Sequence, residues 1–296
     1  MSLQALKPKQ ELGPKSMCMA GTHVETTNTL ISWIAECNDG VLWCSGLVGM
    51  GKSSLCSTLY QLLSFDMSSR SRLAAFIRYD RTEYRDSSEL ITSIAYSLGM
   101  FDHRIGTIIA KALTASCAAV KMLASKSCTQ FRLLLQEPLE AIQDLQDEGP
   151  LVVMIDSLDE SDVSEELLAV LADGFGPELS FMWLIVSSRP KEKISHVFKN
   201  RQHLHCYPLD TSSEEMKHDI QHFIQQKFDS IKDKCIWGMH NEPDVVTWLA
   251  ERASELFIWV VRVCSFLCDF PSLQRLEALL KTMIPADAIE ALTALY

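Results

Sequence analysis

The apolar and polar positions along the chain divide it into two regions of different character. From about residue 41 to residue 208, short continuous apolar runs alternate with segments whose apolar residues recur at helical spacing. The runs Leu151–Ile155 and Phe181–Val186 are typical of strands buried on both faces of a parallel sheet. Further strands are expected at Val41–Ser45, Leu73–Tyr79 and His203–Tyr207. This alternation predicts an α/β fold with a parallel sheet.

Helices are predicted between these strands and throughout the last part of the chain. The periodic segments that connect the strands are Thr26–Cys37, Ser53–Leu63, Ser88–Leu98, Asp102–Leu113, Thr129–Leu145 and Ser164–Leu171. Ser87 or Ser88 is expected to cap the third of these helices. After Asp210 only helical patterns follow, to Phe228 and then at Asp244–Cys268, Ser272–Met283 and Ala286–Tyr296. We therefore expect a leader or linker at 1–25, an α/β domain at 26–209 and an all-helical domain at 210–296.

Composition and charge narrow the range of functions. The chain has 296 residues, of which 47% are hydrophobic and 22% charged, as in a folded protein with one large or two modest domains. Its formal net charge of -11 argues against a general affinity for nucleic acid or anionic lipid, which requires an excess of Lys and Arg. The apolar run 256–268 is too short to span a membrane, and residues 1–15 lack the apolar core of a signal peptide. The ten cysteines include no C-x-x-C pair and are interpreted as thiols of a reducing compartment, so a cytoplasmic protein is expected.

The strongest local signal is a glycine-rich segment between the first predicted strand and the next helix. It reads Gly-Leu-Val-Gly-Met-Gly-Lys-Ser over 46–53 and matches the pattern G-x-x-x-x-G-K-[ST] of phosphate-binding loops. A strand that leads into the motif and a helix that leaves it form the context that the motif requires. A plain glycine turn before a core helix is the alternative interpretation. The residues expected to contact nucleotide are Gly46, Leu47, Val48, Gly49, Met50, Gly51, Lys52, Ser53 and Ser54.

Each residue type in this segment has a chemical reason to bind phosphate. Glycine permits backbone conformations in which successive amide N–H groups point toward one anion. The N-terminus of the following helix adds its positive dipole end. Lys52 supplies a mobile positive charge for the β- and γ-phosphates, and the Ser53 hydroxyl is expected to bind Mg²⁺. The predicted ligands are therefore ATP or GTP together with Mg²⁺.

A second metal ligand is predicted at the end of another strand. Leu151–Ile155 leads to Asp156 at the carboxyl end of an apolar strand, the edge at which open α/β sheets bind their ligands. An unpaired carboxylate at the end of a buried strand is costly without a cation. Asp156 is therefore expected to hold Mg²⁺, usually through water.

Three further residues are candidates for catalysis. Glu160, or as second choice Asp159, is expected to orient or deprotonate the attacking water. Arg189 follows the strand Phe181–Val186 and is expected to contact the γ-phosphate from the same edge of the sheet. The competing interpretations are that the Asp-Glu pair belongs to a helix cap and that Arg189 is a surface residue of a turn.

At this point the chain resembles a known family. It is similar to fungal NACHT-domain proteins of the signal-transduction (STAND) NTPases, close to the nephrocystin-like N-terminal NTPase group. The segments that carry the resemblance are, in order, Cys18–His23, Leu42–Ser53, Val153–Glu160, Ile185–Pro190 and Leu256–Val260. A small residue after the strand-end aspartate and a trailing Asp-Glu pair are typical of NACHT domains.

The resemblance implies a three-layer α/β NTPase core, with the strand before Arg189 between the phosphate-loop strand and the Asp156 strand. A helical domain follows, and a winged-helix domain would begin near the end of this chain. Members act as nucleotide-gated switches in larger proteins that carry effector and repeat domains, and self-association through the NTPase domain is expected. Their usual context is an NLR-like pathway of self/non-self recognition or cell death. This chain is expected to be a core fragment or an unusually short member.

Two positions depart from the family pattern. The segment that usually reads Gly-Thr-Arg has His23 in place of the arginine, which removes any nucleotide contact made by that arginine. Met50 stands where Thr or Ser is common, and its side chain is expected to point away from the phosphates with little effect on binding.

Two other classes of function remain compatible with the sequence. A turnover enzyme, such as a small-molecule kinase or an AAA+ motor, would need an acceptor pocket or lid, for which no clear signal exists. An interaction module with a degenerate nucleotide site is also compatible with the fold, but the intact Lys52, Ser53 and Asp156 argue against it. No arginine finger in cis is recognisable, so a switch with slow hydrolysis is the leading expectation.

Overall fold

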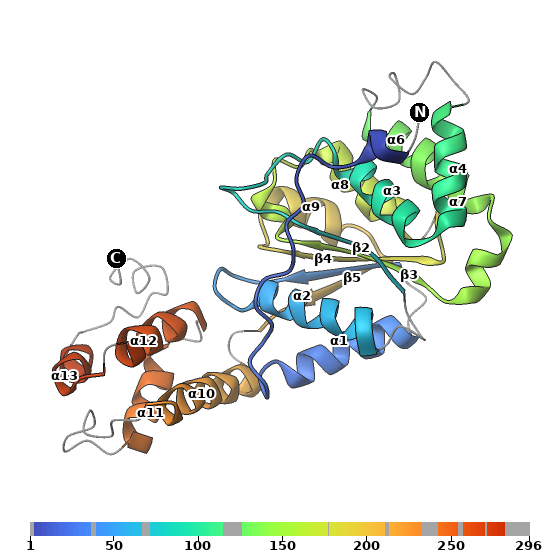
Figure 1. Ribbon diagram of the computed structural model, residues 1–296. Helices are drawn as coiled ribbons and strands as arrows, with labels where there is room; N and C mark the ends of the chain where they lie inside the picture. The colour runs from blue at the N-terminus through green and yellow to red at the C-terminus, as the bar shows by residue number, and fades with distance from the viewer. Residues whose placement is uncertain are drawn as a thin grey trace. The chain divides into compact units, whose positions relative to one another are not determined.

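A parallel five-stranded sheet is the centre of the computed structural model (Figure 1). The structure describes residues 3–36, 40–66, 72–114, 126–176, 178–210, 213–231, 242–253, 257–269 and 271–281. The strands are β1 (Val41–Ser45), β2 (Arg72–Arg78), β3 (Leu151–Asp156), β4 (Met182–Ser188) and β5 (Leu204–Pro208). They lie in the order β2-β3-β4-β1-β5, and every neighbouring pair is parallel. The predicted α/β fold with a parallel sheet is confirmed.

The three central strands explain why continuous apolar runs predicted the sheet. Every residue of β1, β3 and β4 is buried, as expected for strands covered by helices on both faces. Strand β4 lies between β1 and β3, as the family resemblance implied, and in register Ser45 pairs with Ser188. The carboxyl ends of these strands, where Ser45, Asp156 and Ser188 lie, are therefore neighbours.

Helices cover both faces of the sheet and make a three-layer arrangement (Figure 1). Helices α1 (Val24–Glu36) and α2 (Lys52–Gln61) lie on one face, where Trp33 of α1 packs against Trp183 with ring centroids 5.9 Å apart. The other face is covered by a larger set, in which Phe198 packs edge-on against Trp43 at 5.5 Å. The helices of this set are α3 (Leu90–Phe101), α4 (His103–Thr114), α6 (Ser127–Phe131), α7 (Glu137–Glu140), α8 (Glu165–Gly174) and α9 (Glu192–Lys199). Short 3-10 or π-helical turns complete the fold: η1 (Leu3–Leu6), η2 (Leu62–Asp66), η3 (Arg132–Gln136), η4 (Gln143–Glu148) and η5 (Leu158–Glu160).

Two of the predicted helices differ from the structure for local reasons. The predicted cap at Ser87 or Ser88 is wrong: α3 begins at Leu90 with Glu89 at the cap position and no side-chain cap, and the Leu90 N–H donates to the Ser87 carbonyl oxygen at 3.1 Å. The single helix expected over 129–145 is divided into α6, η3, α7 and η4. Pro138 at the start of α7 has no N–H for a helical hydrogen bond, so the regular ladder is interrupted there.

The chain divides into two compact units. The first contains Met1–Met17, Thr27–Gly46 and Lys52–Pro208, and it holds the sheet. The second contains Cys18–Thr26, Leu47–Gly51 and Leu209–Tyr296. Its helices are α10 (Glu214–Asp229), α11 (Glu242–Arg252), α12 (Phe257–Asp269) and α13 (Leu273–Lys281), and its described residues include no strand. The segment 244–268 thus forms two helices, and the helix predicted at Ala286–Tyr296 lies outside the described residues.

None of the helices in the described ranges combines the length and the apolar character that a membrane span requires.

Candidate functional site

The loop between β1 and α2 has a backbone that depends on glycine. Gly49 and Gly51 have φ values of +80° and +83°, in the left-handed region that other residues rarely adopt. The loop leaves the sheet through Gly46, whose N–H donates to the Ser188 carbonyl oxygen at 3.3 Å. Leu47 and Val48 are exposed at 54% and 48%. The backbone of the loop is thus accessible and shaped by its glycines, as the phosphate-loop pattern requires.

Met50 is the position at which the loop departs from the common pattern. Its side chain is buried, and its sulfur accepts the Leu47 N–H at 2.9 Å. Within the loop, a methionine thioether therefore binds one of the amides. That Met50 has little effect on ligand binding stays a prediction.

The side chain of Lys52 binds the first residue of the loop. Its Nζ donates to the Gly46 carbonyl oxygen at 2.7 Å, joining the first and last turns of the motif. Burial lowers the pKa of Lys52, and the nearby carboxylates of Asp159 and Asp156 oppose this effect. An amine at the start of α2 that is removed from water interacts strongly with any anion that reaches it.

Ser53 and Asp156 come together, as expected for a metal site. The Ser53 hydroxyl donates to Asp156 Oδ1 at 3.2 Å, and the Ser187 hydroxyl donates to the same oxygen at 2.5 Å. Asp156 is 1% exposed, and its second oxygen, Oδ2, is buried with no hydrogen-bond partner among the described residues. A hydroxyl and an unsatisfied carboxylate oxygen on adjacent elements are the ligand types that Mg²⁺ prefers. The residues present therefore fit a magnesium ion.

Arg189 is held by Asp159. The Arg189 backbone N–H donates to Asp159 Oδ1 at 2.9 Å, and its side-chain Nε donates to Oδ2 at 2.5 Å. Burial raises the pKa of Asp159, while Lys191, Lys52 and Arg81 oppose the rise. Arg189 Nη2 is buried and has no partner among the described residues. The pair therefore fixes the guanidinium and leaves one of its nitrogens for a further acceptor.

Glu160 takes a different direction from Asp159. Its carboxylate accepts the Arg81 backbone N–H at 3.4 Å, and it helps to line a surface pocket of about 240 Å³ with Arg81, Arg85 and Lys191. Among the described residues it forms no hydrogen bond or ion pair with Lys52, Ser53 or Asp156. The structure therefore pairs Asp159 with Arg189, and both Asp159 and Glu160 line this pocket.

The central residues 47–51 of the loop belong to the second unit. The Ile258 N–H of α12 donates to the Gly49 carbonyl oxygen at 3.1 Å. His23 is buried, with a left-handed φ of 54°, and its backbone N–H donates to Asp219 Oδ2 at 2.7 Å. The imidazole stacks on Phe257 at 5.7 Å and lies against Gly51. In this chain His23 is thus a packing residue beside the loop, with its Nε2 atom lacking a partner among the described residues.

Gly49→Ala is expected to destabilise the second unit by about 2–4 kcal/mol. A Cβ at this position would lie 2.3 Å from Ile258 Cγ2, and alanine would also be strained at a φ of +80°. Calorimetric melting measures the change. Gly13→Ala is the control, because no atom lies within 4 Å of a Cβ at that position. Equal melting temperatures for the two variants would contradict the close packing of α12 on the loop.

The stability of the second unit is expected to fall as the pH drops below about 6.5, the ordinary pKa of histidine. Burial lowers the pKa of His23, against the opposing effects of Asp219, Glu215 and the Met50 backbone. The unfolded chain therefore binds the proton first as the pH falls, and folding loses free energy until the folded pKa is reached. Burial raises the pKa of Asp219. This carboxyl group therefore changes the pH dependence of stability mainly above its ordinary pKa of about 4, and His23 does so mainly below its ordinary pKa of about 6.5.

His23→Asn tests this pH dependence. Asparagine tolerates the left-handed backbone and does not titrate, so the variant keeps the φ of 54° that His23 adopts. Melting curves between neutral pH and mildly acidic pH are expected to show a steeper loss for the wild type than for His23→Asn. Parallel curves would mean that His23 has the same pKa in the folded and unfolded chains.

Sequence reasoning missed the residues that orient the predicted ligands. Ser187 donates to Asp156 and also accepts the Ser157 N–H at 3.0 Å, and Ser188 accepts the Trp43 Nε1–H at 2.8 Å. Both serines are 0% exposed. Two hydroxyl groups at the end of an otherwise apolar buried strand were the available signal, because buried polar groups require partners.

One solved structure of another protein shares this architecture. The Walker-type ATPase PABY2304 of Pyrococcus abyssi is 15% identical, with a TM-score of 0.55 over 91% of this chain and 74% of that one. Domain III of the Thermotoga maritima replication initiation protein DnaA is 13% identical, with a TM-score of 0.42 over 96% of this chain and 97% of that one. Together with the strand–loop–helix motif, the first likeness defines the fold as that of the P-loop NTPases, a class of nucleotide-binding proteins.

The family follows from a sequence model. The model described as Nephrocystin 3, N-terminal matches residues 21–189, which is more than half of the chain. This protein therefore belongs to the nephrocystin 3 N-terminal family. No curated protein sequence matches it at a significant level.

Proposed function

We propose that this protein is a NACHT-type nucleotide switch of the STAND class, in a fungal NLR-like pathway of self/non-self recognition or cell death. It binds ATP or GTP with Mg²⁺ and hydrolyses it slowly, and the nucleotide state controls self-association in the cytoplasm. Residues 26–209 form the NTPase domain and 210–296 the helical domain, with a linker at 1–25. Membership of the nephrocystin 3 N-terminal family supports the nucleotide-binding part of this proposal.

One observation carries the proposal. The buried Oδ2 atom of Asp156 has no partner among the described residues, while Oδ1 is bound by Ser53 and Ser187. An unsatisfied buried carboxylate oxygen is costly unless a cation binds it. The Asp156 carboxylate therefore favours a site that is completed by a divalent ion and its nucleotide.

The residues of the chain have distinct proposed roles. Lys52 exchanges the Gly46 carbonyl oxygen, now 2.7 Å away, for the β- and γ-phosphates. Ser53 and Asp156 would hold Mg²⁺, which would supply positive charge to neutralise the phosphates. Arg189 contributes its remaining nitrogen to the γ-phosphate and thereby distinguishes triphosphate from diphosphate.

The attacking water needs a carboxylate to orient it. Asp159 already accepts two hydrogen bonds from Arg189. Glu160 is therefore the first candidate for this role and Asp159 the second. Hydrolysis without an arginine finger supplied in cis is expected to be slow.

The phosphate loop is also the proposed route from nucleotide to assembly. Leu47–Gly51 belong to the second unit and Lys52–Ser53 to the first, so one loop contributes to both units. The Ile258 N–H that binds the Gly49 carbonyl oxygen ties α12 to the backbone that would surround phosphate. If this backbone rearranges on nucleotide exchange, the hydrogen bond between Gly49 and Ile258 of α12 would change with it.

Binding, turnover and mass are measured together to test the switch. We expect tighter binding of labelled ATP or GTP with Mg²⁺ than with EDTA, and hydrolysis at about 10⁻⁴ to 10⁻² per second. Light scattering is expected to give a larger mass with a non-hydrolysable triphosphate than with diphosphate. Many turnovers per second, or phosphate transfer to a small acceptor, would reject the switch in favour of a turnover enzyme. Absence of nucleotide binding would favour an interaction module.

A further inference from the structure

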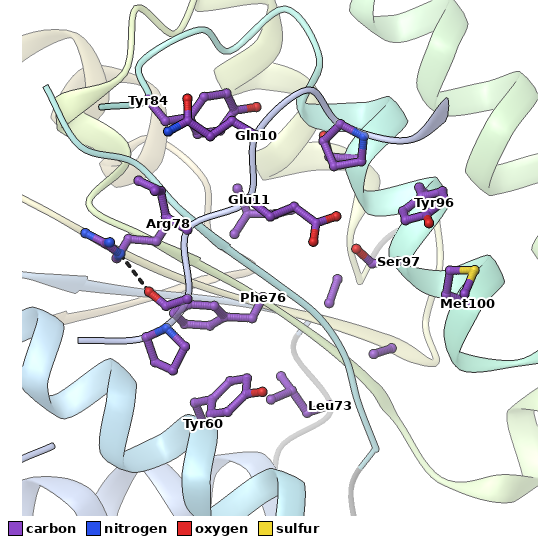
Figure 2. Close-up of a pocket in the computed structure, with 18 of the residues that line it drawn as sticks. Gln10, Glu11, Tyr60, Leu73, Phe76, Arg78, Tyr84, Tyr96, Ser97 and Met100 are labelled. Atoms are coloured by element: carbon purple, nitrogen blue, oxygen red, sulfur yellow. Dashed lines mark hydrogen bonds between the residues drawn. The ribbon is translucent and has the colours of Figure 1, made fainter. Parts of the chain in front are cut away.

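A second cavity lies in the first unit, away from the phosphate loop. It has a volume of about 500 Å³ and is enclosed by residues 8–14 of the leader, strand β2, helix α3 and Tyr60 (Figure 2). We call it the leader pocket. Neither the phosphate loop nor Ser53 or Asp156 contributes to its lining. Its volume is within the range of pockets that bind small organic molecules.

The wall of the leader pocket is aromatic. Tyr60, Phe76, Tyr84 and Tyr96 come from four different parts of the chain and line the same cavity (Figure 2). Tyr60 and Phe76 pack edge to face at 5.1 Å, and Tyr84 is stacked on Tyr79 at 5.3 Å, so three of the four rings are held by ring contacts. Aromatic faces attract organic cations through their negative quadrupoles.

A single carboxylate projects into this aromatic space. Glu11 is an exposed residue of the leader, and its side chain extends toward Tyr96 and Ser97 (Figure 2). Arg78 is the only cation in the lining, and its guanidinium turns away from Glu11 (Figure 2). It donates to the Gly13 carbonyl oxygen at 2.8 Å and pairs with Asp80 at 3.6 Å. The positive charge of the wall is therefore already used, whereas its negative charge is not.

Two neighbouring buried hydroxyl groups in the lining are poorly satisfied. Tyr84 and Ser93 are 8% and 3% exposed, and Ser93 lies close enough to Tyr84 to oppose the rise that burial causes in the pKa of Tyr84, but neither hydroxyl makes a hydrogen bond of good geometry among the described residues. Buried polar groups normally find partners, and an exception needs an explanation. A bound molecule with hydrogen-bond donors would provide one.

The charges around the pocket favour the same kind of ligand. Lys9 and Glu89 neutralise each other at 2.5 Å, as do Arg78 and Asp80. Glu11 remains in the wall, and Asp86 adds a second acidic group near Tyr84 and Lys9. Lys15, which lies near Asp80, offsets Asp86, so the unpaired negative charge of the wall is that of Glu11, which attracts cations.

We propose that the leader pocket is a binding site for a small organic ammonium ion carried on an apolar or aromatic body. The ammonium group of the ligand binds Glu11 and donates to the Tyr84 and Ser93 hydroxyls, while the apolar part of the ligand packs on the aromatic wall. This site is independent of the nucleotide function proposed above, because it shares no residue with the phosphate loop.

Calorimetric titration of the whole chain with 2-phenylethylammonium, and with neutral 2-phenylethanol of the same shape, tests the proposal. We expect the ammonium ion to bind with a Kd of about 0.1–1 mM and the alcohol at least about tenfold more weakly. Glu11→Gln is expected to remove this preference for the ammonium ion. Glu166→Gln, an exposed carboxylate of α8 outside the pocket, is expected to leave it unchanged.

A second variant tests the hydroxyl group separately. Tyr84→Phe removes a buried hydroxyl whose contact with Ser93 has poor hydrogen-bond geometry. It is therefore expected to melt at the same or a higher temperature, yet to bind the ammonium ion at least about threefold more weakly. Binding of the ammonium ion and the alcohol with equal affinity, no heat at about 10 mM ligand, or unchanged affinity in Glu11→Gln would each overturn the proposal.

Discussion

Lys52→Met is expected to weaken binding of labelled ATP or GTP by at least about 100-fold. A hydrogen bond to a charged group contributes about 1.5–3 kcal/mol, and Lys52 is expected to contact two phosphates. In the free protein its amine is partly removed from water, and burial lowers its pKa. Methionine fills a similar volume without that charge, so the variant is expected to stay folded. Fluorescence titration gives the affinity, and a melting curve verifies the fold.

A matched lysine separates a specific effect from a general loss of charge. Lys193 donates its Nζ to the Val163 carbonyl oxygen at 2.5 Å, much as Lys52 does to Gly46, but it lies outside the loop. Lys193→Met should therefore bind nucleotide as the wild type does. If Lys52→Met also binds as the wild type does, no phosphate reaches this lysine and the proposed site is wrong.

Asp156→Asn is expected to abolish the dependence of nucleotide binding on Mg²⁺. Wild-type protein should bind triphosphate at least about tenfold more tightly with Mg²⁺ than with EDTA, and the variant should show a ratio near one. Asparagine keeps the oxygen that Ser53 and Ser187 bind, but it removes the charge from the unsatisfied position. Titration of Mg²⁺ at fixed nucleotide measures the ratio.

Asp173→Asn is the matched control for this experiment. Its carboxylate pairs with Arg201 at 2.9 Å and is about half exposed, so it has no part in the predicted metal site. The variant should retain the full Mg²⁺ effect. A full Mg²⁺ effect in Asp156→Asn would show that the ion is held by other groups or by the phosphates alone.

The sheet was predictable because its central strands carry their signal locally. The strands predicted at 151–155 and 181–186 are observed at Leu151–Asp156 and Met182–Ser188. Both contain continuous apolar runs of strand length, and every residue of these strands is buried, as expected where helices cover both faces of a parallel sheet. Most of the helix predicted at Thr129–Leu145 is observed, because residues 127–140 are continuously helical, but Ile142 is extended and only a 3-10 turn follows, which the apolar spacing did not indicate.

The candidate site was predictable only where one motif contains the information. Lys52 and Ser53 follow from eight consecutive residues, and Asp156 follows from the strand that it ends. Other contacts join residues that are distant in sequence: Asp159 binds Arg189 thirty residues away, and His23 binds Asp219 across 196 residues. No local pattern specifies such partners, because they depend on how the elements pack.

Residues 8–14 of the leader have a consequence for solubility. They run beside β2, which is an edge of the sheet, and the Arg78–Gly13 and Lys9–Glu89 contacts hold them there (Figure 2). An uncovered edge strand offers a row of amides and carbonyls to which strands of other copies can add. The leader thus covers the edge strand at which copies of the chain could otherwise pair. Deletion of the leader would expose this edge, so the shortened chain is expected to self-associate more than the full chain.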